Sequence, residues 1–123
     1  MNNVIAAFSL DQVSRLTGLS DSQLASWDRE GFFSPALAYK NRRSPYSRIY
    51  TFEDVVGLRT LSILRDRVSL QHLKRAANRL KEHSGRPWSE LILYTLNREV
   101  HFKRPDTGQI EAAVSGQYGA TIP

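Results

Sequence analysis

The feature that most constrains the fold is a pair of short helical segments, separated by T-G-L-S, near the start of the chain. Ser9 precedes the first segment and Gln12 follows three residues later, which is the pattern of a capping box at a helix N-terminus. Apolar residues then recur at helical spacing as far as Leu16. Gly18 can adopt the left-handed conformation that ends a helix. These signals predict a helix over Leu10–Thr17.

A second helix is predicted immediately afterwards. Ser20 and Gln23 repeat the capping signal. Leu24 and Trp27 supply an apolar stripe at helical spacing, and Gly31 closes the helix at its C-terminal end. Two short helices with so tight a turn between them have the spacing of a helix-turn-helix.

An arginine-rich loop follows the second helix. Residues 36–40 and 47–50 alternate apolar and polar side chains on either side of a polar turn that contains Pro45. This pattern predicts a two-stranded hairpin with a long basic tip, and a hairpin in this place is the wing of a winged helix-turn-helix. Four aromatic side chains of this region are expected to lie in the core rather than to stack on bases. They are Trp27 of the second helix, Phe32 and Phe33 before the hairpin, and Phe52 after it.

Two further helices are predicted after the hairpin. One runs from residue 52 to about 67 and is capped by the pair Thr51 and Asp54. The other runs from residue 70 to about 83 and is capped by Ser69. The apolar residues of the third helix are expected to pack in the core: Phe52, Val55, Val56, Leu58, Leu61, Ile63 and Leu64.

The composition changes near residues 84–88, where Gly85 and Pro87 end the helical pattern. Beyond this point LILYTL, EVHFK and QIEAAV read as strands joined by an Asn97-Arg98 turn and a P-D-T-G turn. The predicted fold is mainly α, a winged helix-turn-helix DNA-binding domain at 8–84 followed by a small antiparallel β meander at 88–123. A meander this small is marginal alone, so we expect it to pack on the helices or pair with another chain.

The net charge of +5 is concentrated in the middle of the chain. Residues 40–86 hold twelve basic and four acidic residues, a net of +8, whereas residues 1–39 have a net of −2 and residues 87–123 a net of −1. A basic block of this kind indicates a polyanionic partner, and the alternative is a solvated charged helix face.

Several other classes of protein lack support in the sequence. Cysteine is absent, so there is no disulfide framework and no thiolate metal site. The three histidines share no metal-ligand spacing, and no G-x-S-x-G motif occurs. We therefore expect no catalytic activity, no metal and no cofactor. No stretch resembles a signal peptide or approaches the roughly 20 apolar residues of a membrane span, so we expect a cytoplasmic protein with no membrane partner.

Four segments resemble the N-terminal winged helix-turn-helix of the MerR family. They are FSLDQVSRLTGLS, LASWDREGFFSP, YSRIYTFEDVVGLRTL and VSLQHL, in order along residues 8–77. The resemblance implies that the second helix enters the DNA major groove and that Arg48, after the wing turn, contacts phosphate.

The sequence departs from that pattern in three ways. Ser22 and Ala25 stand where the family often carries arginine, no long dimerising helix follows, and there are no effector-site cysteines. The tail WSELILYTLNREVHFKRPDTGQIEAAVSGQ is instead similar to the segment after a MerR-like domain in antitoxins that pair with PIN-domain ribonuclease toxins. Those antitoxins continue into a toxin-contacting region, whereas this sequence stops at Ile122-Pro123, so we expect a truncated chain or a short member.

Exposed polar positions on the second helix are expected to face base edges: Ser22, Gln23 and Ser26. For Gln23 two roles remain open, a bidentate contact to adenine and a purely capping role. Basic and polar residues elsewhere are expected to contact phosphates or enter the minor groove. These residues are Arg15, Arg29, Lys40, Asn41, Arg42, Arg43, Tyr46 and Arg48.

The predicted function is that of a sequence-specific regulator that binds duplex operator DNA as a homodimer, because one such module covers only one half-site. The narrower prediction is the autoregulating antitoxin of a toxin–antitoxin operon, with a PIN-domain ribonuclease toxin as its partner. The alternative is a protein-interaction module whose basic face docks an acidic toxin, with DNA binding incidental.

Overall fold

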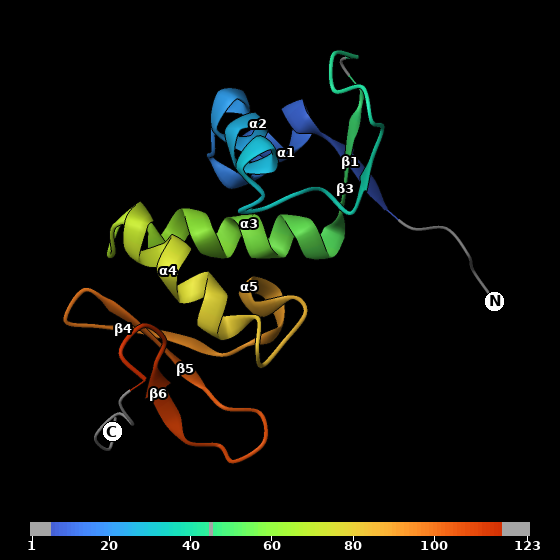
Figure 1. Cartoon of the computed structure of the whole chain (residues 1–123). Helices are drawn as coiled ribbons and strands as arrows, with labels where there is room; N and C mark the ends of the chain where they lie inside the picture. Colours follow the sequence, from blue (N-terminus) through green and yellow to red (C-terminus); the bar gives the residue numbers. More distant parts are fainter. Residues whose placement is uncertain (1–5, 45, 117–123) are drawn as a thin grey trace. The chain divides into compact units, whose positions relative to one another are not determined.

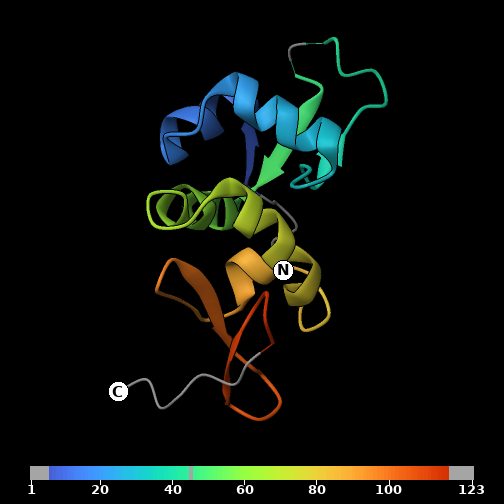
Figure 2. The same ribbon diagram turned by 60° about the vertical axis from the view of Figure 1, so that its left-hand side comes forward.

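The computed structural model describes residues 6–44 and 46–116 and divides the chain into two compact units, residues 1–62 and 63–123. Figures 1 and 2 show the elements of both units. No helix in the described part of the chain has both the length and the apolar character needed to cross a membrane. The predicted division into residues 8–84 and 88–123 stays a prediction.

The first unit begins with the predicted helix-turn-helix. Helix α1 spans Leu10–Thr17 and α2 spans Asp21–Glu30, and each ends at a glycine in the left-handed conformation, with φ of 81° at Gly18 and 74° at Gly31. The capping box of α1 is complete, because Ser9 Oγ accepts from the Gln12 N–H and Gln12 Oε1 accepts from the Ser9 N–H. The two predicted helices and their caps are confirmed.

The wing belongs to a sheet of three strands rather than two. Strand β3 (Arg48–Thr51) pairs antiparallel with β2 (Leu37–Ala38) on one side and with β1 (Ala7–Ser9) on the other. The hairpin predicted at 36–40 and 47–50 is therefore correct in kind but shorter on its first side, and β1 was not predicted. The predicted turn residue Pro45 lies outside the described residues.

Helix α3 (Phe52–Leu64) starts at the predicted cap, where Thr51 and Asp54 exchange backbone-to-side-chain hydrogen bonds of 3.0 and 3.2 Å. Its core contacts come from Leu58 and Leu61, both fully buried. The prediction that Phe52 lies in the core is wrong, since 62% of it is exposed. The reason is geometric: nine residues at 3.6 residues per turn place Phe52 on the opposite side of the helix from Leu61. Val56 and Ile63, also predicted to pack, are exposed as well.

The second unit contains α4 (Leu70–Leu80), the short helix α5 (Pro87–Glu90) and a separate sheet. Strands β4 (Leu93–Leu96), β5 (Glu99–Lys103) and β6 (Ile110–Ala112) form an antiparallel meander in the order β4-β5-β6. Asn97 and Arg98 have positive φ, which is the geometry of a tight two-residue hairpin turn. The three predicted strands are confirmed in place, although β4 and β6 are shorter than LILYTL and QIEAAV, whereas α5 was not predicted.

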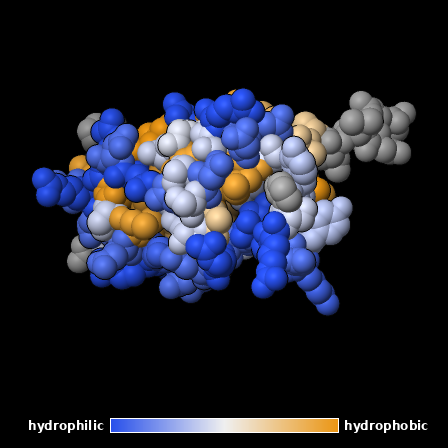
Figure 3. Space-filling model, turned by 90° about the horizontal axis from the view of Figure 1, so that it is seen from above, coloured by the Kyte–Doolittle hydropathy of each residue, from blue (hydrophilic) through white to orange (hydrophobic). Residues whose placement is uncertain are grey.

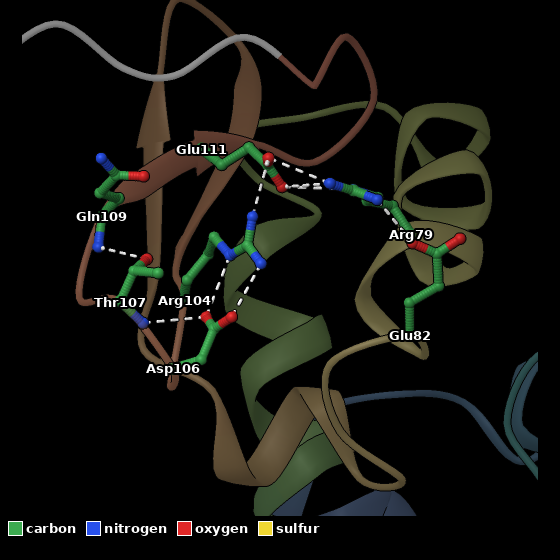
Figure 4. A network of polar contacts seen from close by, with 7 residues as sticks. All are labelled: Arg79, Glu82, Arg104, Asp106, Thr107, Gln109 and Glu111. Atoms are coloured by element: carbon green, nitrogen blue, oxygen red, sulfur yellow. Dashed lines mark hydrogen bonds and ion pairs between the residues drawn. The ribbon is translucent and has the colours of Figure 1, made fainter.

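A buried ion-pair network connects α4 to the sheet (Figure 4). The Glu111 carboxylate on β6 is 2% exposed and accepts from Arg79 Nη2 at 2.8 and 3.0 Å and from Arg79 Nε at 3.2 Å. Arg104 Nη1 lies 4.0 Å from Glu111 Oε1, and Arg104 also binds Asp106 at 2.8 Å. The carboxylate is therefore desolvated and depends on arginines from two parts of the unit.

A second polar contact fixes the start of β5. The buried His72 on α4 accepts a hydrogen bond at Nε2 from the Val100 N–H, at 2.9 Å. This requires an unprotonated Nε2. Burial lowers the pKa of His72 below its usual value of 6.5, and Arg75 and His101 act in the same direction while Glu99 opposes them.

This contact predicts a loss of stability in weak acid. Because the folded chain holds His72 neutral, the unfolded chain binds a proton more readily as the pH falls below about 6.5. The free energy of unfolding should be highest above that pH and decrease below it. The His72→Gln variant keeps an acceptor but does not titrate, so urea unfolding between pH 5 and 7.5 should show a flatter dependence for it. Parallel losses in the two proteins would contradict this account.

Candidate nucleic-acid interface

The buried side of α2 determines which of its residues face outward. Leu24 and Trp27 are buried, and the Trp27 ring meets Phe32 edge-on with centroids 5.1 Å apart. At the N-terminus, Ser20 Oγ accepts from the Gln23 N–H at 3.1 Å. The helix is thus capped at its N-terminus and buried along the face of Leu24 and Trp27. Its polar residues lie on the remaining faces.

The structure places the three predicted base-contact residues on the first two turns of α2. Ser22 is exposed, with its hydroxyl 3.2 Å from that of Ser20. Ser26 is half-buried and donates to Glu30 Oε1 at 3.1 Å. Gln23, which follows Ser22 in the sequence, is half-buried. Because Ser22 and Ser26 are four residues apart, they share one face of the helix.

The predicted phosphate-contact residues are mostly exposed. Arg15 on α1 is paired with the exposed Asp11 at 3.1 Å, a contact that water and salt weaken. Within the described part of the wing, Asn41 Oδ1 accepts from the Arg43 N–H at 3.0 Å. Seen from the side that carries α1, α2 and the wing tip, the surface is mainly hydrophilic, with hydrophobic areas between the polar side chains (Figure 3). The other exposed members of the predicted set are Arg29, Lys40, Arg42, Arg43 and Tyr46.

Arg48 is the exception, because it is only 8% exposed. Its Nε donates to Asp28 Oδ2 at 2.7 Å. The same carboxylate oxygen accepts from Arg42 Nε at 3.0 Å, and Arg42 also donates to the Tyr39 carbonyl. Two arginines, one from the loop and one from β3, therefore meet one acid on α2. That Arg48 contacts phosphate stays a prediction.

Asp28 was not among the predicted site residues. It is 8% exposed, and burial raises the pKa of its carboxyl, but hydrogen bonds from Arg42, Arg48 and Ser34 outweigh that effect and hold the pKa below its usual value. The sequence contained a signal for it, since Asp28 lies four residues after Leu24 and directly beside Trp27, on the apolar side of the helix. An acid in that place needs a buried cationic partner.

The arrangement can present a polar helix face and a group of cations as one unit. The Asp28 carboxylate links α2 to the wing loop through Arg42 and to the start of β3 through Arg48, so that the loop's position depends on the helix. Among the described residues, no group of three or more metal-ligating side chains is assembled.

Comparison with known families finds that residues 8–80 match the model described as MerR HTH family regulatory protein. The match includes α1, α2, the wing, α3 and α4. No curated protein and no solved structure matches the chain.

Proposed function

This chain belongs to the MerR family of helix-turn-helix regulatory proteins and is a DNA-binding transcription regulator, and we propose that it binds a duplex operator as a homodimer through α2 and the wing. In this proposal α2 enters the major groove and the wing lies against the flanking backbone.

The observation that carries the proposal is the pair of hydrogen bonds on Asp28. With Arg42 and Arg48 bound to its carboxylate at 3.0 and 2.7 Å, the wing is fastened to α2 before any ligand arrives. A surface that is already arranged loses less conformational entropy on binding. This supports a helix and a wing that engage adjacent parts of one duplex together.

The residues of the two parts suit different tasks. The first two turns of α2 offer hydroxyl and amide groups without a cation, which suits contacts to base edges. The wing and the end of α2 supply exposed cations, which suit phosphate oxygens because that attraction is independent of sequence. We propose that affinity comes mainly from Arg29, Lys40, Arg42 and Arg43, and that discrimination comes from Ser22, Gln23 and Ser26.

The test is a comparison of the protein's own promoter with random duplex DNA over a series of salt concentrations. Specific regulation predicts preference for the promoter at every concentration. It also predicts a steep fall in affinity with salt, because each neutralised phosphate releases a counterion. Equal, weak binding to both duplexes would reject the operator and favour a basic surface that docks an acidic protein.

Replacing Gln23 by alanine separates its two possible roles. If the amide reads adenine, the variant should lose discrimination at one base position, at a cost of about 1–3 kcal/mol, and keep its affinity for random DNA. Gln12→Ala is the matched control, because Gln12 caps α1 through its side chain. Binding to a set of single-base operator variants measures the effect. If both substitutions lower thermal stability alike and leave base preference unchanged, Gln23 serves only as a cap.

The narrower form of the proposal is a repressor that acts as the antitoxin of its own operon. Its support is the likeness of the tail sequence to antitoxins that pair with PIN-domain ribonucleases. Co-expression with any ribonuclease-like protein encoded beside it tests this form, which predicts a stable complex and relief of growth arrest. If growth arrest persists although the protein binds its promoter fully, the antitoxin role is rejected and the protein is a regulator without a toxin partner.

A further inference from the structure

The outer edge of β4 has backbone groups that the sheet does not use. The Lys103 N–H donates to the Ile92 carbonyl at 3.0 Å, and Tyr94 is opposite His101. Because bonded pairs alternate along antiparallel strands, the backbone groups of Ile92, Tyr94 and Leu96 point toward β5. Those of Leu93 and Thr95 point the other way, at the edge where the sheet order ends (Figure 1).

The opposite edge of the sheet is partly closed by the chain itself. Beyond β6 the chain turns back, and the Gly116 N–H donates to the Ala112 carbonyl at 2.9 Å. Near the start of β5, the Val100 N–H donates to His72 Nε2. Edge strands are commonly protected by charged residues or proline, but β4 is L-Y-T-L. Of the two edge strands of this sheet, β4 is the one that contains neither a charged residue nor a proline.

We propose that two copies of this chain pair antiparallel along β4, with Leu93 of one copy opposite Thr95 of the other and Tyr94 on the two-fold axis. In this register both outward-facing residues form bonded pairs, and each pair exchanges both of its backbone hydrogen bonds. The interface is isologous, as a two-fold dimer requires. It rests on the proposed function for its biological purpose, because it would join two DNA-binding modules.

The side chains in this register favour a second copy over another partner. Ile92, which is 55% exposed, is opposite Leu96 of the other copy, which is 45% exposed, and the symmetry repeats this pair. Glu90, at the end of α5, precedes β4, and Arg98, in the β4–β5 turn, follows it, so an antiparallel pair of β4 strands brings the acidic end of one copy near the basic end of the other. Both are exposed, and their charges are opposite at each end of the strand. Apolar and charged positions are thus complementary to themselves in one register.

The absence of cysteine from the chain makes crosslinking a clean test. Residues opposite each other in a non-bonded antiparallel pair have Cα atoms about 4.5 Å apart, within the roughly 4.4–6.8 Å range of disulfides. Tyr94→Cys should therefore form a covalent dimer on mild oxidation, on the order of tenfold more than Leu96→Cys, whose own copies would lie several residues apart. Urea should remove the difference.

A mixture provides a second measurement if Tyr94→Cys folds poorly. Ile92→Cys and Leu96→Cys chains should crosslink when mixed and not when oxidised separately. Equal crosslinking of Tyr94→Cys and Leu96→Cys, with no gain on mixing, would overturn the interface, as would a monomeric wild-type chain in sedimentation equilibrium. These experiments contain no DNA. Failed crosslinking with promoter preference intact rejects the interface alone, and crosslinking without promoter preference rejects the proposed function alone.

Discussion

Asp28→Asn is expected to weaken binding to every DNA sequence, even though it removes a negative charge from a protein that binds a polyanion. The amide has nearly the volume of the carboxylate but leaves the buried Arg48 without a counter-charge. Releasing Arg42 and Arg48 should let the wing leave its position beside α2. We expect a loss of roughly tenfold in affinity, which is about 1.4 kcal/mol. Stability should fall by about 2 kcal/mol, because a buried charge loses its partner.

The matched control is Asp21→Asn, which neutralises an exposed acid on the same helix. If only net charge matters, both variants should bind DNA more tightly, because each removes repulsion from phosphate. If Asp28 positions the wing, the two variants should change affinity in opposite directions. Fluorescence anisotropy with one labelled duplex measures both. Tighter binding by Asp28→Asn would show that the ion pairs do not position the wing.

The second large effect is expected from Arg79→Met in the second unit. Methionine keeps the aliphatic part of the side chain but leaves the Glu111 carboxylate, 2% exposed, with only the distant Arg104. Removing one partner of a buried ion pair is strongly destabilising, and we expect a loss of about 3 kcal/mol in the free energy of unfolding. Urea unfolding followed by circular dichroism measures it.

Two further variants make this result interpretable. Arg75→Met removes an exposed cation from the same helix and should change stability little. Adding Glu111→Leu to Arg79→Met removes the unpaired charge and should recover most of the loss. Equal losses for Arg75→Met and Arg79→Met would mean that the network of Figure 4 contributes little to stability.

The helix starts and the tight turns of this protein could be predicted because their signals are local. Capping pairs three residues apart, the two helix-ending glycines and the Asn97-Arg98 turn all involve neighbouring residues. Helix ends were less accurate: α3 ends at Leu64 and α4 at Leu80, about three residues early in each case. After both ends the chain tightens into three-residue turns, such as the Arg67 N–H to the Leu64 carbonyl, and no glycine marks the change.

The elements that were missed depend on distant partners or on an ambiguous residue. Strand β1 is three residues long and is held by β3, some forty residues later. Its register cannot be read from three residues with no clear alternation. Proline ends the pattern of one helix but is also favoured at the first position of the next, and Pro87 starts α5.

The candidate site likewise contains residues that local patterns predict and a pairing that they do not. The outward polar positions of α2 follow from its apolar stripe, so Ser22 and Gln23 could be chosen from the sequence. The pairing of Asp28 with Arg48 crosses twenty residues, and no local pattern specifies which arginine of the loop an acid will meet. The consequence is that the sequence predicts the same role for all the wing arginines, whereas the structure separates Arg43, which is exposed, from Arg48, which is buried.

The most direct test of a DNA-binding surface made of α2 and the wing is an NMR titration of the isotope-labelled protein with its promoter duplex. At 14.0 kDa the chain suits backbone assignment. We expect the largest chemical-shift changes in residues 20–30 and 39–48, and we expect random DNA to affect the wing more than α2. Changes confined to residues 87–116, with α2 and the wing unaffected, would contradict it.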